Sequence, residues 1–136
     1  MLAEAENVLF IGAGSSGILA QYGARYFSSL GKFSLHINDP FFPVNEYPLR
    51  NSIAVVLSVS GETPSTIAQV NTLKKEGSKI ISITNNRSCT IAKMSDINIP
   101  YYVMEEYREH SNITTQLPVI YLLEALARNT YRLINK

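Results

Sequence analysis

Three hydroxyl side chains gather in the short stretch Ser-Val-Ser-Gly-Glu-Thr, which begins at Ser58. Ser58, Ser60 and Thr63 each carry an O–H group that can donate to an anion. Gly61 lets the backbone come close to such a ligand. Thr63 and the proline after it favour a helix start, where free N–H groups attract anions. Because the stretch holds no lysine or arginine, it predicts a phosphate site built from neutral donors, unlike a Walker-type loop.

A second polar loop, Gly-Ala-Gly-Ser-Ser-Gly at residues 12–17, satisfies the pattern G-x-G-x-x-G. This pattern is typical of dinucleotide-binding turns, and Asp39 stands where such a site needs an acid for the ribose. The pattern alone fits a tight strand-to-helix turn equally well. Ser16 favours a third interpretation, since a hydroxyl at the opening of a helix adds an anion donor. We therefore expect Gly14, Ser15 and Ser16 to contact a phosphate.

The whole chain has the size and composition of one globular domain, residues 1–136. Apolar residues make up 46% and charged residues 17%, and the formal net charge is +1, which gives no electrostatic footprint for nucleic acid. No apolar run reaches the roughly 18 residues of a membrane span. The one cysteine, Cys89, excludes an internal disulfide and fits a reducing cytoplasm. We expect a cytoplasmic protein without membrane, metal or cofactor, and with no nucleic-acid contact of its own.

Apolar runs and helical spacings alternate along the chain. The runs typical of strands cover residues 7–11, 33–37, 53–59, 79–84 and 96–100. The helical spacings cover residues 16–30, 63–76, 88–94 and a final helix that ends near residue 132. Residues 38–52 contain three prolines, so we expect a loop there, or at most a short helical turn.

The alternation of strands and helices predicts a three-layer αβα sandwich in the α/β class. The strands are apolar throughout, which suits a parallel sheet that is buried on both faces. Five strands in flavodoxin-like order fit the length better than six in dinucleotide-fold order. In such sheets ligands bind beyond the carboxyl ends of the strands at the switch point, and both polar loops follow strands. Each loop could still be only a turn that caps a helix.

At these residues the chain resembles the SIS (sugar isomerase) domain family over nearly its whole length. The positions that carry the resemblance are Gly12, Gly14, Ser16, Ala20, Ser58, Ser60, Gly61, Thr63, Ala68, Gly77, the strand at 80–84, Ala92 and Asp96. The resemblance implies a phosphosugar site with Ser16, Ser58, Ser60 and Thr63 in the phosphate-binding positions. It also implies a homodimer with its sites near the subunit interface.

Within that family the chain looks most like the effector domain of RpiR-type transcriptional regulators. The stretch Glu106-x-Arg108 followed by HSNITTQLPVIYLLEAL carries this likeness, which implies that Ser111 lies near the sugar. Asn112 stands where an arginine is common. Pro118 should kink the last helix or delay its start to about residue 115. The helix-turn-helix domain of such regulators is missing, which fits an excised fragment, a truncated relative or a free-standing domain.

Aldose–ketose isomerisation would need a base and an acid in the site. The candidate groups are His36, Glu62, Glu105, Glu106, Glu109 and His110. Glu106 and His110 are the best placed of these, because they cluster before the last helix. A solvated charged segment explains the same cluster, so the sequence assigns no catalytic residue.

The combined pattern predicts a phosphosugar-sensing module, as in an RpiR-type regulator without its DNA-binding domain. Two alternatives stay open. One is a phosphosugar isomerase that interconverts an aldose and a ketose. The other is a dinucleotide-binding domain, which would depend on Asp39.

Overall fold

A five-stranded parallel sheet forms the centre of the protein in the computed structural model, which describes residues 1–44 and 51–135. The strands of this sheet are β1 (Asn7–Ile11), β2 (Ser34–Ile37), β3 (Ser52–Ser58), β4 (Lys79–Asn85) and β5 (Ile97–Tyr101). The helices are α1 (Ser15–Ser29), α2 (Pro64–Lys75), α3 (Thr90–Met94) and α4 (Leu117–Ile134). Two short strands, β6 (Tyr107–Arg108) and β7 (Ser111–Asn112), make a separate antiparallel hairpin.

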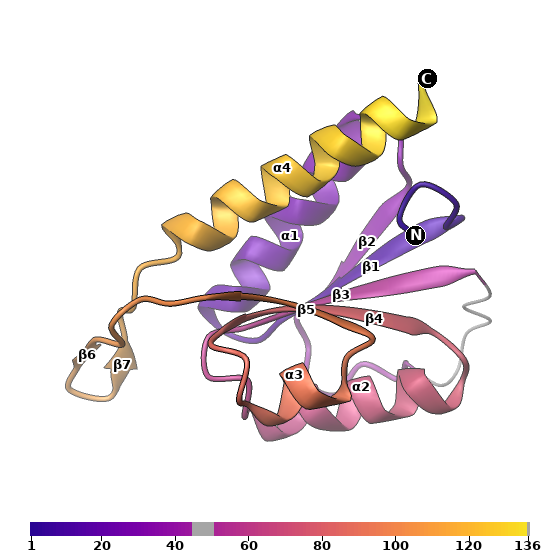
Figure 1. Ribbon diagram of the computed structural model, residues 1–136. Coiled ribbons are helices and arrows are strands. Elements are labelled where there is room, and N and C mark those ends of the chain that lie inside the picture. The colour runs from indigo at the N-terminus through magenta and orange to yellow at the C-terminus, as the bar shows by residue number, and fades with distance from the viewer. Residues whose placement is uncertain (45–50, 136) are drawn as a thin grey trace.

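The strand order is β2-β1-β3-β4-β5, with every neighbouring pair parallel. This confirms the five-stranded flavodoxin-like order expected from the sequence. Helices α1 and α4 cover one face of the sheet, and α2 and α3 cover the other (Figure 1). The switch point lies between β1 and β3, which pair directly with Ile11 opposite Val56. The loops that follow these two strands are therefore neighbours in space.

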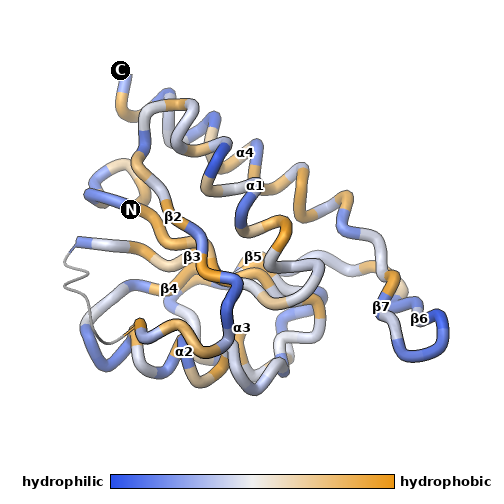
Figure 2. Tube along the Cα trace, turned by 180° about the vertical axis from the view of Figure 1, so that it is seen from behind, coloured by the Kyte–Doolittle hydropathy of each residue, from blue (hydrophilic) through white to orange (hydrophobic). Residues whose placement is uncertain are grey.

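The core divides into two layers, one on each face of the sheet. Alternate residues of one strand enter different layers: Phe10 packs toward α1 and α4, and Ile11 packs toward α2 and α3. This period of two follows from the pleat of a strand. Most of β1 and all of β3 are buried, and Figure 2 shows the apolar colour running along the central strands. A sheet covered on both faces explains why the sequence showed continuous apolar runs.

The last helix begins at Leu117, which puts Pro118 in its first turn. Proline is tolerated there because the first N–H groups of a helix lack intrahelical acceptors. The expected delay of the helix is therefore confirmed, with a start two residues later than anticipated. The hairpin β6–β7 was not anticipated. Its turn includes Glu109, a non-glycine residue with a φ of 58°, and the hairpin projects from the body of the domain (Figure 1).

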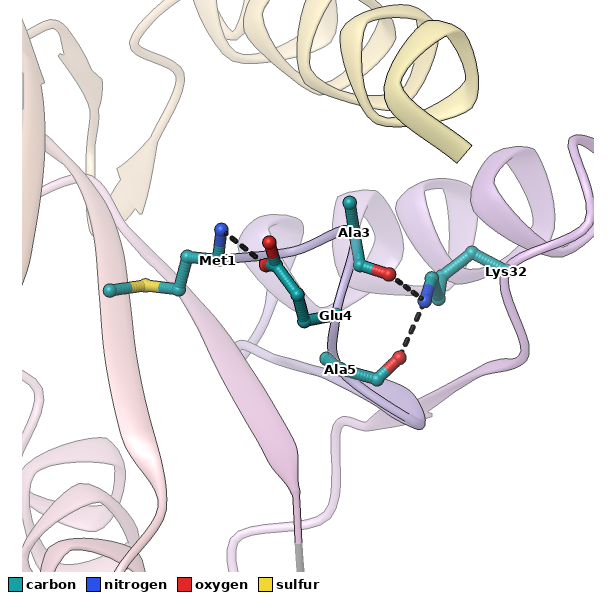
Figure 3. A network of polar contacts seen from close by, with 5 residues as sticks. All are labelled: Met1, Ala3, Glu4, Ala5 and Lys32. Atoms are coloured by element: carbon teal, nitrogen blue, oxygen red, sulfur yellow. Dashed lines mark hydrogen bonds and ion pairs between the residues drawn. The ribbon is translucent and has the colours of Figure 1, made fainter. Parts of the chain in front are cut away.

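A polar network fixes the N-terminal segment against the end of α1 (Figure 3). The Lys32 ammonium donates to the carbonyl of Ala3 at 3.1 Å and to the carbonyl of Ala5. The amino group of Met1 lies 2.8 Å from the Glu4 carboxylate. The segment buries Ala5 against the core and leads into β1. The network lies at the amino end of β1, opposite the end from which the polar loops emerge.

Across the described ranges 1–44 and 51–135, no helix has the length and apolar character needed to cross a bilayer.

Candidate functional site

The loop between β1 and α1 is shaped by its glycines. Gly14 is the N-cap of α1 and has a φ of 58°, which an L residue rarely adopts. A Cβ on Gly12 would lie 2.6 Å from the Ser16 carbonyl oxygen, so only glycine lets strand and helix approach this closely. Ser16 is itself buried, and its hydroxyl makes no hydrogen bond within the described residues. The glycines thus account for the turn, and Ser16 adds an unused donor at the helix start.

The loop between β3 and α2 is held partly by its own hydroxyl groups. The Gly61 amide donates to Ser58 Oγ at 2.9 Å, and the Glu62 amide donates to Ser60 Oγ at 3.1 Å. Both serines act as acceptors here, which leaves each hydroxyl proton free for a ligand. Thr63 is the N-cap of α2, but its side chain makes no capping bond. The helix start expected at Thr63 is thus confirmed, and its hydroxyl is free for another partner.

A second set of contacts ties the same loop to the start of α3. The Glu62 carboxylate accepts from the Thr90 amide at 2.8 Å and from Thr90 Oγ1 at 2.6 Å. These bonds hold the pKa of Glu62 below its ordinary value of 4.5. The Ile91 amide donates to the Gly61 carbonyl at 3.0 Å. Gly61, with a φ of 69°, lies so close to the buried Cys89 that a Cβ there would strike its sulfur. The loop is therefore held in place by the first residues of α3.

Both loops, β7 and the segment after β7 open onto one cavity of about 360 Å³. Its lining residues are Ala13, Gly14, Ser15, Ser16, Leu57, Ser58, Val59, Thr63, Ser111, Asn112, Thr114 and Gln116. Six of the residues that the sequence analysis assigned to a ligand site belong to this lining. They are Gly14, Ser15, Ser16, Ser58, Thr63 and Ser111. The starts of α1 and α2 meet at this cavity, and helix N-termini favour negative charge.

Four other candidates do not line the cavity. Ser60 and Gly61 belong to the same loop and shape it from outside the lining. The two candidate catalytic residues are both exposed: Glu106 directly precedes β6, and His110 lies in the turn between β6 and β7. Among the described residues the cavity lining therefore includes no acid or base that could move a proton.

Three polar lining residues were missed by the sequence analysis as ligand contacts: Asn112, Thr114 and Gln116. Asn112 Oδ1 accepts from the Thr114 amide at 3.0 Å and from Thr114 Oγ1 at 2.6 Å, so these two side chains largely satisfy one another. Gln116 is the N-cap of α4 and makes no side-chain capping bond. No pattern in the sequence marks these residues as ligand contacts, because they reach the lining only through the course of the chain at and after the short hairpin β6–β7.

The remaining ionisable candidates are engaged or remote. Asp39 Oδ1 accepts from the Phe41 amide at 2.9 Å in a local turn, and Asp39 does not line the cavity. His36 is exposed on β2, an edge strand. Within residues 1–44 and 51–135 there is no cluster of histidine, cysteine and acidic residues that could hold a metal ion. Chemically, the arrangement suits the binding of an anion by neutral donors.

Comparison with known proteins gives the family. The SIS domain model matches residues 1–126, so the chain belongs to the SIS domain family. An uncharacterized HTH-type transcriptional regulator of Clostridium perfringens is 31% identical over 128 residues, which cover 93% of this chain and 46% of the regulator. A probable arabinose 5-phosphate isomerase of Haemophilus influenzae is 30% identical over 132 residues, which cover 93% of this chain and 39% of the isomerase.

A solved structure has the same fold as this chain. The E. coli CFT073 protein determined in complex with A5P matches this chain with a TM-score of 0.83 at 27% identity. The match covers 97% of this chain and 73% of that protein. This chain spans about half the length, or less, of the regulator and the isomerase that it resembles.

Proposed function

We propose that this chain binds a phosphorylated sugar and acts as a sensing module of an RpiR-type transcriptional regulator. One observation carries the proposal: the starts of α1 and α2 and the hydroxyls of Ser16, Ser58 and Thr63 meet at one cavity. Two helix N-termini and several O–H donors offer a phosphate monoester many hydrogen bonds without a cationic side chain. Ser60 and Gly61 contribute by shaping the loop, and Ser111 by facing the sugar.

Sensing is favoured over catalysis by the absence of an acid or base in the lining formed by the described residues. A sensor has two conformations, and its ligand binds one of them more tightly than the other. The ligand can shift the equilibrium by no more than this difference in binding free energy. DNA would then be contacted by a helix-turn-helix domain, not by residues 1–136. The regulator of Clostridium perfringens supports this assignment.

The direct test is calorimetric titration with hexose phosphates and pentose phosphates, against the same sugars without phosphate. We expect binding of at least one sugar phosphate below millimolar concentration and no binding of the free sugars. Equal affinity for a sugar with and without its phosphate would remove the role given to the two helix starts.

A phosphosugar isomerase is the second candidate, and the arabinose 5-phosphate isomerase of Haemophilus influenzae is the observation in its favour. Isomerisation moves a proton between adjacent carbons, so an isomerase exchanges that proton with solvent. A sensor incubated in D₂O with fructose 6-phosphate or arabinose 5-phosphate should incorporate no deuterium. Incorporation that is lost in Glu106→Gln or His110→Asn would establish the isomerase instead.

We further propose that the chain is a cytoplasmic homodimer. Large apolar side chains stand exposed in the segment before the hairpin, where Met104 lies, and at the start of α4, where Leu117 and Tyr121 lie. Leu117 and Tyr121 are four residues apart on α4 and share one side of the helix, and exposed apolar surface commonly marks a protein interface. The buried thiol of Cys89 is consistent with a reducing compartment.

A further inference from the structure

The outward side of α4 forms a groove of about 580 Å³ whose lining residues all belong to this one helix. They are Leu117, Ile120, Tyr121, Glu124, Ala125, Arg128, Asn129 and Arg132. Spacings of three and four put these residues on one side of the helix. Val119, Leu123 and Ala127, which lie on the other side, are buried in the core. The groove is therefore a surface that a partner can cover along most of the length of α4.

The chemistry of this groove changes along the helix. Its first half is apolar and includes the exposed side chains of Leu117 and Tyr121. Its second half includes the two arginines Arg128 and Arg132, both exposed. The acid Glu124 lies between the two halves. A partner that matches the groove needs a surface that is basic opposite the first half and apolar opposite the second half.

The two charges near the middle of the groove have no counter-ion in the described part of the chain. Glu124 Oε2 accepts from the Tyr22 hydroxyl at 2.6 Å. The Arg128 guanidinium lies 5.9 Å from the centroid of the Tyr26 ring. Within residues 1–44 and 51–135 neither side chain makes an ion pair. Both charges are thus available to an opposite charge on a partner.

We propose that the groove is filled by α4 of a second copy of this chain, which runs antiparallel to the first. The two-fold axis passes between residues 124 and 125, near the middle of the groove. Each side chain then faces the one that lies equally far on the other side of the axis, so that Tyr121 faces Arg128 and Leu117 faces Arg132. The proposal rests on the proposed function, because it gives the pairing within the proposed homodimer.

The charges of the groove favour this antiparallel pairing over a parallel one. A two-fold axis brings the same surface of both copies together, so a parallel pair would set Arg128 and Arg132 beside their own copies. The antiparallel pair instead sets the Arg128 guanidinium against the Tyr121 ring, which is a cation–π contact. The alkyl stem of Arg132 covers Leu117. Glu124 lies about one helical turn from Arg128 of the second copy, close enough for an ion pair.

The same pairing brings a cation to the phosphosugar cavity, whose lining includes no lysine or arginine among the described residues. Leu117 directly follows Gln116, which lines that cavity and is the N-cap of α4. Arg132 of the second copy, opposite Leu117, would therefore lie beside the cavity. Within the described residues its guanidinium makes one long hydrogen bond, 3.3 Å to Asn129 Oδ1, so it can turn to a phosphosugar ligand. The second copy thus completes the site with a charged donor.

Engineered cysteines test the pairing. A mixture of Tyr121→Cys and Arg128→Cys chains in oxidised glutathione should form a disulfide between copies, and Ala125→Cys should crosslink with its own copy. The Cα atoms of these pairs would lie within about 7 Å, the limit for a disulfide. Tyr121→Cys alone should not crosslink, because its two copies would be offset by roughly 10 Å along the helices. Leu133→Cys is the matched control, since Leu133 is exposed on α4 but lies outside the groove. Electrophoresis without reductant gives the result.

A second measurement tests the contribution of Arg132 to the site. Arg132→Met keeps an unbranched stem and removes the charge, so the dimer should persist in light scattering. Calorimetry with glucose 6-phosphate, fructose 6-phosphate and arabinose 5-phosphate should show at least about a 10-fold loss of affinity for each compound that binds the wild type. Arg25→Met is the matched control, because Arg25 is exposed on α1 and lines neither the groove nor the cavity. Its affinity should be unchanged.

The outcomes separate this inference from the function beneath it. A disulfide from Tyr121→Cys alone, or no disulfide between copies in any mixture, overturns the antiparallel pairing and leaves phosphosugar binding intact. Equal affinity of wild type and Arg132→Met, or an equal loss in Arg25→Met, overturns the contribution of the second copy to the site. Failure of every sugar phosphate to bind the wild type removes the proposed function and the role of Arg132 together, whereas the disulfides still decide the pairing.

Discussion

At the scale of single residues, the cavity depends on hydroxyl groups whose protons the fold leaves unused. Ser16 is the clearest case, because it is buried, lines the cavity and makes no side-chain hydrogen bond within the described residues. Ser16→Ala should leave the fold intact and remove one bond to a charged phosphate. Such a bond contributes about 1.5–3 kcal/mol, or roughly a 10- to 150-fold loss of affinity, measurable by calorimetry.

The control for this prediction is Ser78→Ala, the same substitution at the other end of the sheet. Ser78 precedes β4, and its buried hydroxyl has no hydrogen-bond partner. Removing that hydroxyl should leave ligand affinity unchanged. A similar loss of affinity in both variants would indicate a general effect on the fold rather than a contact made by Ser16.

Glu62 gives a prediction that depends on pH. Thr90 stabilises the ionised carboxylate in the folded protein, which lowers its pKa below the ordinary value of 4.5. A lowered folded-state pKa means a stabilisation that is present above the unfolded-state pKa and is lost as the pH falls through the folded-state pKa. Wild type should therefore melt above Glu62→Gln at pH 7, and the difference should shrink below pH 4.5. A difference in melting temperature that stays constant with pH would contradict this role of the charge.

The sequence identified the residues of the two strand-following loops and missed those after the hairpin. Ser16, Ser58 and Thr63 were predictable because parallel strands bring their following loops to one edge. Thr114 and Gln116 were not, since their position depends on how a short hairpin folds back across that edge. Ser60 and Glu62 lie in the predicted loop, but the sequence does not give the direction of their side chains. Ser60 accepts a bond within the loop, and Glu62 binds Thr90 at the start of α3.

At the scale of elements, the loop before α2 must fit tightly against the start of α3. Gly61 has a φ of 69°, and a Cβ on it would strike Cys89. Gly61→Ala should lower the free energy of unfolding by about 2–5 kcal/mol, which combines the left-handed backbone cost with overpacking. Chemical denaturation measures this change.

Gly77→Ala provides the matched comparison for that prediction. Gly77 has a φ of 89°, but open space surrounds the position of its absent Cβ. Only the backbone cost of about 1–2 kcal/mol should appear there. Equal destabilisation by the two substitutions would mean that the contact between Gly61 and Cys89 contributes nothing.

The order and type of the main elements could be predicted because each contains a hydrophobic pattern that extends over several residues. Apolar runs predicted β1 with the bounds that the structure has, and β3 with bounds shifted by one residue. The hairpin β6–β7 has only two residues in each strand, too few to produce a periodic pattern. Its charged turn predicted a solvated segment, and Figure 2 shows that turn in the hydrophilic colour.

At the scale of the whole molecule, large apolar side chains are exposed both in the segment before the hairpin and at the start of α4. Met104 is 84% exposed, Leu117 72% and Tyr121 73%. Leu117 and Tyr121 are four residues apart on α4 and therefore share one side of the helix. Because Leu117 directly follows the cavity residue Gln116, a partner that covers this surface would stand beside the ligand. This arrangement connects the proposed homodimer to the proposed sensing function.

The double variant Leu117→Asp and Tyr121→Asp should convert the homodimer to a monomer, because four unpaired charges would be buried in the symmetric interface. Size-exclusion chromatography with light scattering measures the mass directly. Phe41→Asp is the control, since Phe41 is 89% exposed but follows β2 at the opposite edge of the sheet from β5. The monomer should also bind sugar phosphate without the change of assembly that a regulator requires. A variant that remains dimeric would place the interface elsewhere, and a monomeric wild type would remove the homodimer from the proposed function.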